Sequence, residues 1–206
     1  MINTYANANN RAEIVGKICS EYKFSHEVYG EIFYTFSVSL PRLSDCCDYV
    51  NIIASDRLLY DCEYRLGDKV FVSGQFRSYN NYDECGSRLV LALFAKSVSL
   101  AGKDEPYVNE IILNGYICKP PVYRTTPFGR EITDILLAVN RNHNKSDYIP
   151  CITWGRNAKF AEVLSVGTKV TVVGRMQSRE YQKKLSETET VTKTAYEISV
   201  TKIETM

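Results

Sequence analysis

Apolar and polar positions alternate along most of the chain, in short runs rich in Val, Ile, Thr, Phe and Tyr that turn residues separate. This period of two is typical of half-buried β-strands. It predicts five strands in the first half, at Glu13–Ser20, Phe33–Leu40, Tyr49–Ser55, Lys69–Tyr79 and Leu89–Leu100. It predicts five more in the second half, at Glu110–Lys119, Glu131–Asn140, Tyr148–Trp154, Lys169–Tyr181 and Lys193–Ile203.

One stretch in each half departs from this alternation. Arg156–Leu164 places its apolar residues at helical spacing, and Gly167 follows as a stop signal. Leu58–Tyr64 occupies the same place in the first half. Five strands with one helix between the third and the fourth is the order of an OB-fold barrel, so we predict an all-β chain of two tandem OB-fold barrels.

An internal repeat at an offset of 99 to 100 residues supports this division. Residues of the first half that recur in the second include Asn10, Ile14, Gly16, Cys19, Gly30, Arg42, Asp48, Tyr49, Gly67 and Gly74. Their counterparts are Asn109, Leu113, Gly115, Cys118, Gly129, Arg141, Asp147, Tyr148, Gly167 and Gly174. The segment AGKDEP between the copies has the composition of a linker, so we predict domains at 1–103 and 104–206.

The composition excludes several classes of protein. The chain has 206 residues, 45% of them hydrophobic and 24% charged, as in an ordinary globular protein. It has neither an apolar run long enough to cross a membrane nor a signal peptide, so we expect a cytoplasmic protein without a membrane partner. Seven cysteines without C-x-x-C spacing and only two histidines argue against disulfides, a metal site or a cofactor.

The net charge of +1 gives no argument for a polyanionic partner by itself. The first half carries 11 Lys/Arg against 12 Asp/Glu, and the second carries 14 against 12. Between Lys119 and Lys184 there are 12 basic and 5 acidic residues. This basic stretch is compatible with nucleic-acid binding and equally with a solvated surface.

Several motifs of the second half resemble a known family. They are RTTPFG before its second strand, LAVNR at the end of that strand, the aromatic residue and W-G of the third, and GRMQSREY in the fourth. Together they resemble the bacterial single-stranded DNA-binding protein (SSB) family over nearly all of residues 109–203. The first half resembles that family only through the repeat.

The resemblance implies a function and a set of site residues. Members hold single strands of any sequence by stacking bases on aromatic rings and pairing phosphates with basic groups. The aromatic positions of the family correspond to His143, Tyr148, Trp154 and Tyr181. A lone Trp in a small barrel is also commonly buried, so a core position for Trp154 is the alternative.

Basic residues on the same predicted elements are candidates for phosphate contacts. They are Arg124, Arg130, Arg141, Arg156, Arg175, Arg179 and Lys183. The sequence does not separate those that contact phosphate from those that only face solvent.

The first half has Ser55 where the second has Trp154, and its net charge is −1. It keeps the candidates Arg42, Tyr49, Arg77, Tyr79 and Tyr82. A second, weaker DNA-binding face and a structural or pairing role are both compatible with this pattern.

The favoured hypothesis is a non-enzymatic protein that binds single-stranded DNA, as a homodimer with four OB-folds if it assembles as the family does. An adaptor for replication, priming or plasmid transfer, with one DNA-binding and one protein-binding barrel, is the alternative. Against an enzyme, the sequence has no Gly-rich phosphate loop, no G-x-S-x-G motif and no carboxylate-rich metal cluster. Many members end in an acidic tail that recruits other enzymes, but this chain ends YEISVTKIETM at its last predicted strand, so we expect no such tail.

Overall fold

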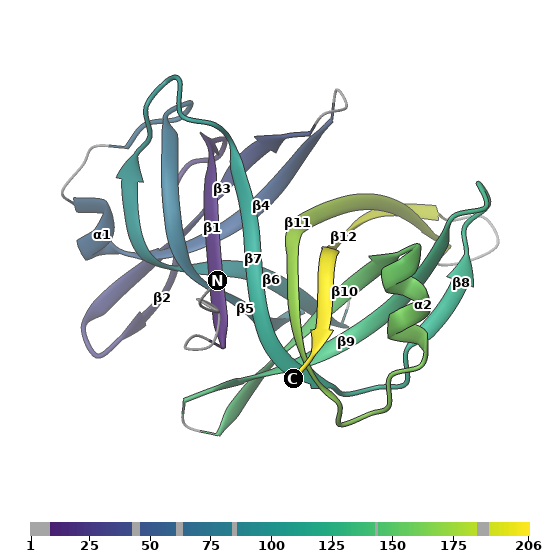
Figure 1. Ribbon diagram of the computed structural model, residues 1–206. Helices are drawn as coiled ribbons and strands as arrows, with labels where there is room; N and C mark the ends of the chain where they lie inside the picture. Colours follow the sequence, from purple (N-terminus) through teal and green to yellow (C-terminus); the bar gives the residue numbers. More distant parts are fainter. Residues whose placement is uncertain (1–8, 43–45, 61–63, 84–85, 143, 185–189) are drawn as a thin grey trace.

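The computed structural model describes residues 9–42, 46–60, 64–83, 86–142, 144–184 and 190–206, and within these ranges it leaves the side chains of 81–88 and 180–193 undescribed. Two β-barrels lie side by side, one from each half of the chain (Figure 1). Each barrel has the five predicted strands and a short helix, which confirms the tandem OB-fold prediction.

The first barrel consists of β1 (Asn10–Ile18), β2 (Lys23–Val28), β3 (Glu31–Pro41), β4 (Cys47–Ser55), α1 (Asp56–Tyr60), β5 (Lys69–Asp83) and β6 (Gly86–Leu100). It closes because β1 pairs with both β3 and β5, while β4 and β6 pair in parallel. The short strand β2 was not predicted; it forms a hairpin with β3 at the sheet edge.

The second barrel repeats this order with β7 (Val108–Ile117), β8 (Val122–Thr125), β9 (Glu131–Arg141), β10 (Lys145–Trp154), α2 (Arg156–Glu162), β11 (Lys169–Lys184) and β12 (Thr190–Thr205). Here β7 pairs with β9 and β11, and β10 pairs in parallel with β12. The additional short strand is β8. No helix in the described ranges is long and apolar enough to cross a membrane.

The inward-facing side chains of both barrels form one continuous apolar core, with Ile14, Phe76 and Leu93 from the first barrel and Leu113 and Met176 from the second. Two glycines permit the tight bends of the long strands β5 and β11. A Cβ on Gly74 would lie 2.1 Å from the carbonyl oxygen of Phe94, and one on Gly174 would lie 2.5 Å from that of Ser199. Both glycines adjoin a register shift in the ladder, so they are the inner corners of a β-bulge.

The barrels are joined through their first strands, because β1 pairs antiparallel with β7. In this ladder Asn10 pairs with Leu113, and Ile14 pairs with Asn109. Since Asn109 is the repeat equivalent of Asn10 and Leu113 that of Ile14, the second pair is the first with the two strands interchanged. Ala12 and Ile111, which are equivalent themselves, face each other at the centre. The two halves are therefore related by a local two-fold axis.

Buried carboxylates reinforce this junction on both sides of the axis. Asp48 of the first barrel contacts Arg175 of the second at 3.2 Å and accepts a hydrogen bond from the Ser178 amide at 2.9 Å. Its repeat equivalent Asp147 accepts a hydrogen bond from the Ser78 amide of the first barrel at 2.8 Å. Each barrel thus packs one aspartate against the other barrel, Asp48 against β11 and Asp147 against β5.

Candidate nucleic-acid interface

The outward-facing side chains of β9, β10, β11 and β12, here called the second-barrel face, include two of the predicted stacking residues, Tyr148 and Trp154. Asp147, Ile149, Cys151 and Thr153 alternate inward and are buried. Tyr148 and Trp154 therefore point outward together, because β10 and β9 pair without a register shift.

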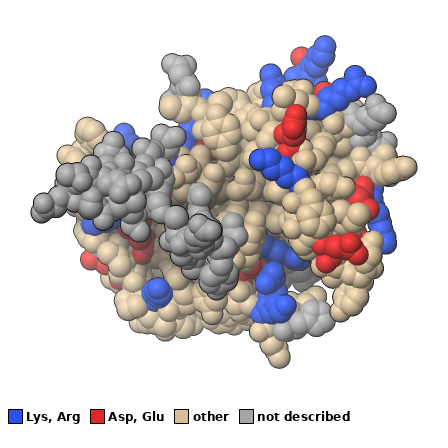
Figure 2. Space-filling view, turned by 180° about the vertical axis from the view of Figure 1, so that it is seen from behind, with Lys and Arg blue, Asp and Glu red and all other residues tan. Residues whose placement is uncertain are grey.

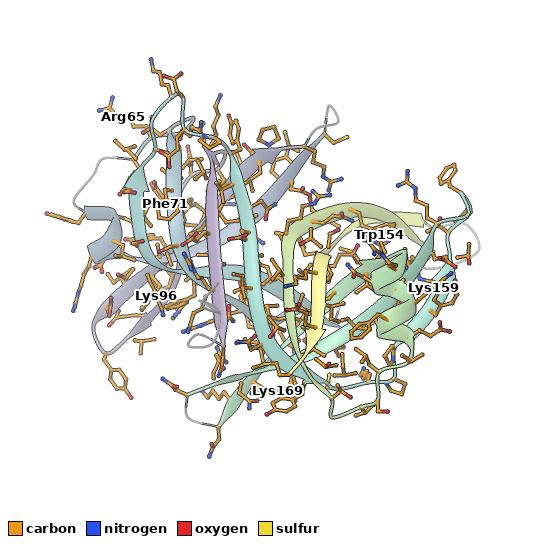
Figure 3. All side chains as sticks on the ribbon, in the orientation of Figure 1. Arg65, Phe71, Lys96, Trp154, Lys159 and Lys169 are labelled. Carbon is orange, nitrogen blue, oxygen red and sulfur yellow. The ribbon has the colours of Figure 1, made fainter. Side chains whose placement is uncertain are left out.

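Trp154 lies at the end of β10, on the outside of the second barrel (Figure 3). Its side chain is partly buried, and its indole N–H donates a hydrogen bond to Ser199 Oγ of β12 at 3.2 Å. That contact satisfies the polar edge of the indole and fixes the plane of the ring. Trp154 is not a member of the barrel core. Tyr148 is 50% exposed.

Two arginines, one on the second-barrel face and one on the adjoining strand β8, are held by carboxylates of neighbouring strands. Arg124 of β8 donates to Asp134 of β9 at 2.7 Å, and this contact raises the pKa of the guanidinium. Arg179 of β11 lies 3.2 Å from Glu197 of β12. Both side chains are more than 40% exposed, so their outer edges remain accessible to a phosphate.

Arg130 and Arg156 are exposed at the edges of this face. Arg130 follows the β8–β9 turn, whose tip carries Phe128 with 91% of its side chain exposed. The residue pattern did not single out Phe128. Its position between Pro127 and Gly129 in a hairpin turn is the signal that would have placed it in solvent.

Four predicted phosphate contacts lie instead at the junction of the barrels. Arg42 and Arg175 both contact Asp48, and Arg42 also donates to the Ser178 carbonyl at 2.6 Å. Arg141 lies 3.2 Å from Asp147. Arg77, on the outward side of β5, donates to Gln75 Oε1 at 3.0 Å. Ion pairs with buried aspartates thus engage Arg42, Arg141 and Arg175 within the protein.

Four further candidates lie outside the described part of the chain. His143 is not described at all, and only the backbone is described for Tyr82 in β5 and for Tyr181 and Lys183 in β11. Their proposed roles stay predictions.

The first barrel presents the remaining candidates on its own outer face. Tyr49 of β4 is 48% exposed, which matches its repeat equivalent Tyr148. Tyr79 of β5 is 44% exposed, and partial burial raises the pKa of its hydroxyl. Tyr49 and Tyr148 thus occupy matching positions on the two barrels.

An aromatic row crosses the outer face of the first barrel, and the residue pattern did not indicate it. Phe33 of β3 pairs with Ser55, and Phe94 of β6 lies beside Ile53. His26 of β2 stacks flat on Phe33, with ring centroids 4.8 Å apart and an angle of 4° between the planes. Arg77 lies over Phe94 at 4.0 Å from the ring centroid. We call His26, Phe33 and Phe94 the first-barrel row.

Charge is spread over much of the remaining surface. Figure 2 shows Lys and Arg interspersed with Asp and Glu over the side of the molecule that faces away in Figure 1, in keeping with the net charge of +1. Among the described residues, no three His, Cys, Asp or Glu side chains gather as a metal site would require.

Comparison with protein families matches residues 108–206 to the model described as the single-strand binding protein family. This match spans the whole of the second barrel, from β7 to β12. The chain is 38% identical over 82 residues to single-stranded DNA-binding protein 1 of Staphylococcus aureus (strain COL), an alignment that covers 36% of this chain and 49% of that protein. It is 37% identical over 82 residues to single-stranded DNA-binding protein A of Bacillus subtilis (strain 168), covering 36% and 48%. The chain thus spans about half the length of these relatives.

Among solved structures, the single-stranded DNA-binding protein from Thermus aquaticus superposes with a TM-score of 0.74 at 17% identity, covering 96% of this chain and 92% of that one. A deletion mutant of the same protein gives a TM-score of 0.76 at 16% identity. The likeness therefore extends over both barrels, and it concerns the fold.

Proposed function

We propose that the protein binds single-stranded DNA with little preference for sequence, and that the second-barrel face is its principal binding surface. The observation that carries this proposal is the pair of outward rings, Tyr148 and Trp154, on the half of the chain that matches the single-strand binding protein family. Its relatives in Staphylococcus aureus and Bacillus subtilis are single-stranded DNA-binding proteins, which supports the same function.

The chemistry of the face suits such a ligand. Bases of any identity present a flat π-surface, and each stacked base is worth about 1–3 kcal/mol when its aromatic partner is truncated. Phosphates are equally independent of sequence, and the same barrel presents accessible guanidinium groups from Arg124, Arg130, Arg156 and Arg179. The bound bases must be unpaired, because a duplex hides their faces.

Trp154 is the single tryptophan of the chain, so its fluorescence reports directly on the proposed surface. We expect an oligothymidine to quench this emission and a duplex of equal length to bind far more weakly. Trp154→Ala should weaken binding about tenfold or more, by the stacking energy of one base, while Trp154→Phe should retain most of the affinity; because neither variant has a tryptophan, their binding is followed by the anisotropy of a dye-labelled oligothymidine. Circular dichroism of both variants separates lost stacking from unfolding. Equal affinity for duplex and single strand would exclude the proposal.

We further propose that the protein acts by binding alone, without catalysis, and that two chains assemble into a unit of four barrels. Mass measurement in solution, with and without oligothymidine, tests the assembly. A monomeric mass under both conditions contradicts it.

A further inference from the structure

A cleft of about 900 Å³ lies where the first barrel meets the hairpin that joins β9 and β10 of the second. Its walls come from the β2–β3 hairpin and from β5 and β6 on one side, and from the ends of β9 and β10 on the other. In Figure 1 both hairpins project toward the lower left of the view. This cleft is separate from the Trp154 end of the second-barrel face.

The charge of the cleft is one-sided. Of the described residues that line it, Arg77, Lys96, Arg141 and Lys145 are basic and none is acidic. Lys96, labelled in Figure 3, comes from the first barrel, and Lys145 comes from the second. Asp147 partly balances Arg141 but is fully buried and is not part of the lining. The cleft therefore has an excess of positive charge open to solvent.

The surroundings of Arg77 disfavour the charged form of its guanidinium. Its Nε is buried without a hydrogen-bond partner. Burial, together with the nearby charge of Arg141, lowers the pKa of its guanidinium. An anion in the cleft would offset the repulsion between Arg77 and Arg141, since both residues line the cleft and both carry positive charge.

The first-barrel row forms the apolar wall of the same cleft. His26, Phe33 and Phe94 all line it, and Tyr29 at the hairpin tip is fully exposed beside them. Phe33 is covered by His26, so the outward surface of the stack is the imidazole ring. Flat rings beside phosphate-binding cations are the two elements that hold an unpaired nucleotide.

We propose that this junction cleft binds a segment of single-stranded DNA that continues from the second-barrel face, with a base on the first-barrel row and phosphates on Lys96 and Lys145. The inference rests on the proposed function and extends it to a site that both barrels build.

The two surfaces are continuous. Lys145 and Tyr148 lie three positions apart on β10, so their backbones are within about 10 Å of each other, although the odd spacing points the two side chains to opposite faces of the strand. The Tyr148 amide also donates to Ser78 Oγ of the first barrel at 2.8 Å, next to Arg77. A strand that leaves Tyr148 toward the first barrel therefore meets the cleft first.

The test removes one cation and one ring from the first-barrel side, as Lys96→Ala/His26→Ala. The matched control is Lys23→Ala/Phe24→Ala, which deletes the same charge and an exposed ring from β2 at positions that do not line the cleft. Both are measured in the full chain by Trp154 quenching. The probes are oligothymidines of about 8 and about 40 nucleotides, since one OB-fold covers roughly 4–16.

On the long strand we expect the cleft variant to bind about tenfold or more weakly than wild type. The slope of log K against log salt should fall by about 0.7, the value for one lost phosphate contact. The control should match wild type, and on the short strand both variants should match it. If the double variant fails to fold by circular dichroism, Lys96→Ala alone is measured, and the salt slope decides.

A cleft variant that equals the control on the long strand overturns this inference while the proposed function stands, and it favours a first barrel that binds protein. Wild-type protein that binds neither probe overturns the proposed function and this inference together.

Discussion

The outer faces of the two barrels place their aromatic rings on different strands. In the second barrel Trp154 occupies β10, between Ile132 on β9 and Ser199 on β12. In the first barrel the corresponding β4 position is Ser55, which pairs with Phe33 on β3, while Phe94 on β6 pairs with Ile53 two residues before Ser55. The order Ile–Trp–Ser across one sheet has become Phe–Ser–Phe across the other.

Both barrels thus carry aromatic rings on this face, but on the middle strand β10 in the second barrel and on the outer strands β3 and β6 in the first. Phe33, Ile53 and Ala92 form a small apolar cluster outside the first barrel, with Phe94 packed against it. A ring on the middle strand would have to displace them. The faces therefore diverged by redistribution of rings, and the absence of a tryptophan does not measure what the first barrel can bind.

The largest expected effect concerns the two junction aspartates, which are repeat equivalents with different surroundings. Asp48→Asn should lower the free energy of unfolding by about 3 kcal/mol, because two arginines lose the carboxylate that pairs them. Asp147→Asn should cost much less, since burial raises the pKa of Asp147 and so disfavours the charged form in the fold. Urea unfolding at pH 7 compares them.

The same pair gives a pH test. Asp147 is harder to ionise folded than unfolded, so its penalty is present at neutral pH and is relieved as the pH falls through the raised pKa toward the ordinary 3.8. Asp147→Asn removes this contribution, and its stability relative to wild type should decline on acidification. Equal costs for both variants at every pH would contradict the asymmetry of the junction.

A smaller effect tests whether the aromatic exchange is mutually exclusive. Ser55→Trp restores the sequence of the second barrel at a position only 6% exposed, between Phe33 and Phe94. We expect it to lower stability by about 2 kcal/mol through overpacking. Adding Phe33→Ile in the same chain should recover part of the loss. A stable single variant would show that the rings do not compete.

Tyr148 and Tyr49, which occupy equivalent positions, allow the DNA-binding contributions of the two barrels to be compared directly. Tyr148 and Tyr49 are 50% and 48% exposed, so burial does not distinguish them. Tyr148→Ala should weaken oligothymidine binding by about 1 kcal/mol, the lower end for one stacked base. Tyr49→Ala should weaken binding less, because the position six residues after Tyr49 is Ser55, whereas the position six residues after Tyr148 is Trp154. A larger loss for Tyr49→Ala, in well-folded protein, would make the first barrel the principal surface.

The smallest effect belongs to a single exposed cation. Arg130→Ala at the β8–β9 turn should leave stability unchanged and reduce the salt slope of binding by about 0.7. Arg65→Ala, on an exposed turn of the first barrel, serves as the control and should leave the slope unchanged. Affinity independent of salt in the wild type would exclude phosphate contacts altogether.

The sequence contains enough information for the fold, because each barrel strand alternates apolar and polar residues and the glycine spacings repeat. The short strand β2 escaped prediction for a physical reason. Its burial pattern is mostly exposed on both faces, so KFSHEV has no apolar side for a period of two to reveal. Its pairing is decided by the Tyr29–Gly30 turn, where both residues adopt positive φ.

The site was less predictable, because its contacts join residues far apart in sequence. Arg175 and Asp48 are 127 residues apart, and only the β1–β7 ladder brings them together. Before that register is known, a junction arginine and a phosphate-binding arginine look alike. The first-barrel row was hidden similarly, because comparing the copies position by position finds Ser55 opposite Trp154 and ignores neighbours across strands.

The covalent link between β6 and β7 changes how the β1–β7 pairing depends on concentration. Two separate OB-folds that meet through their first strands dissociate on dilution, whereas this ladder closes within one molecule at an effective concentration of roughly millimolar. In the β1–β7 ladder, the first barrel therefore pairs with the second barrel of the same chain and not with another first barrel. A substitution on one side of the local axis is therefore not duplicated on the other, and the two outer faces are free to evolve under separate selection.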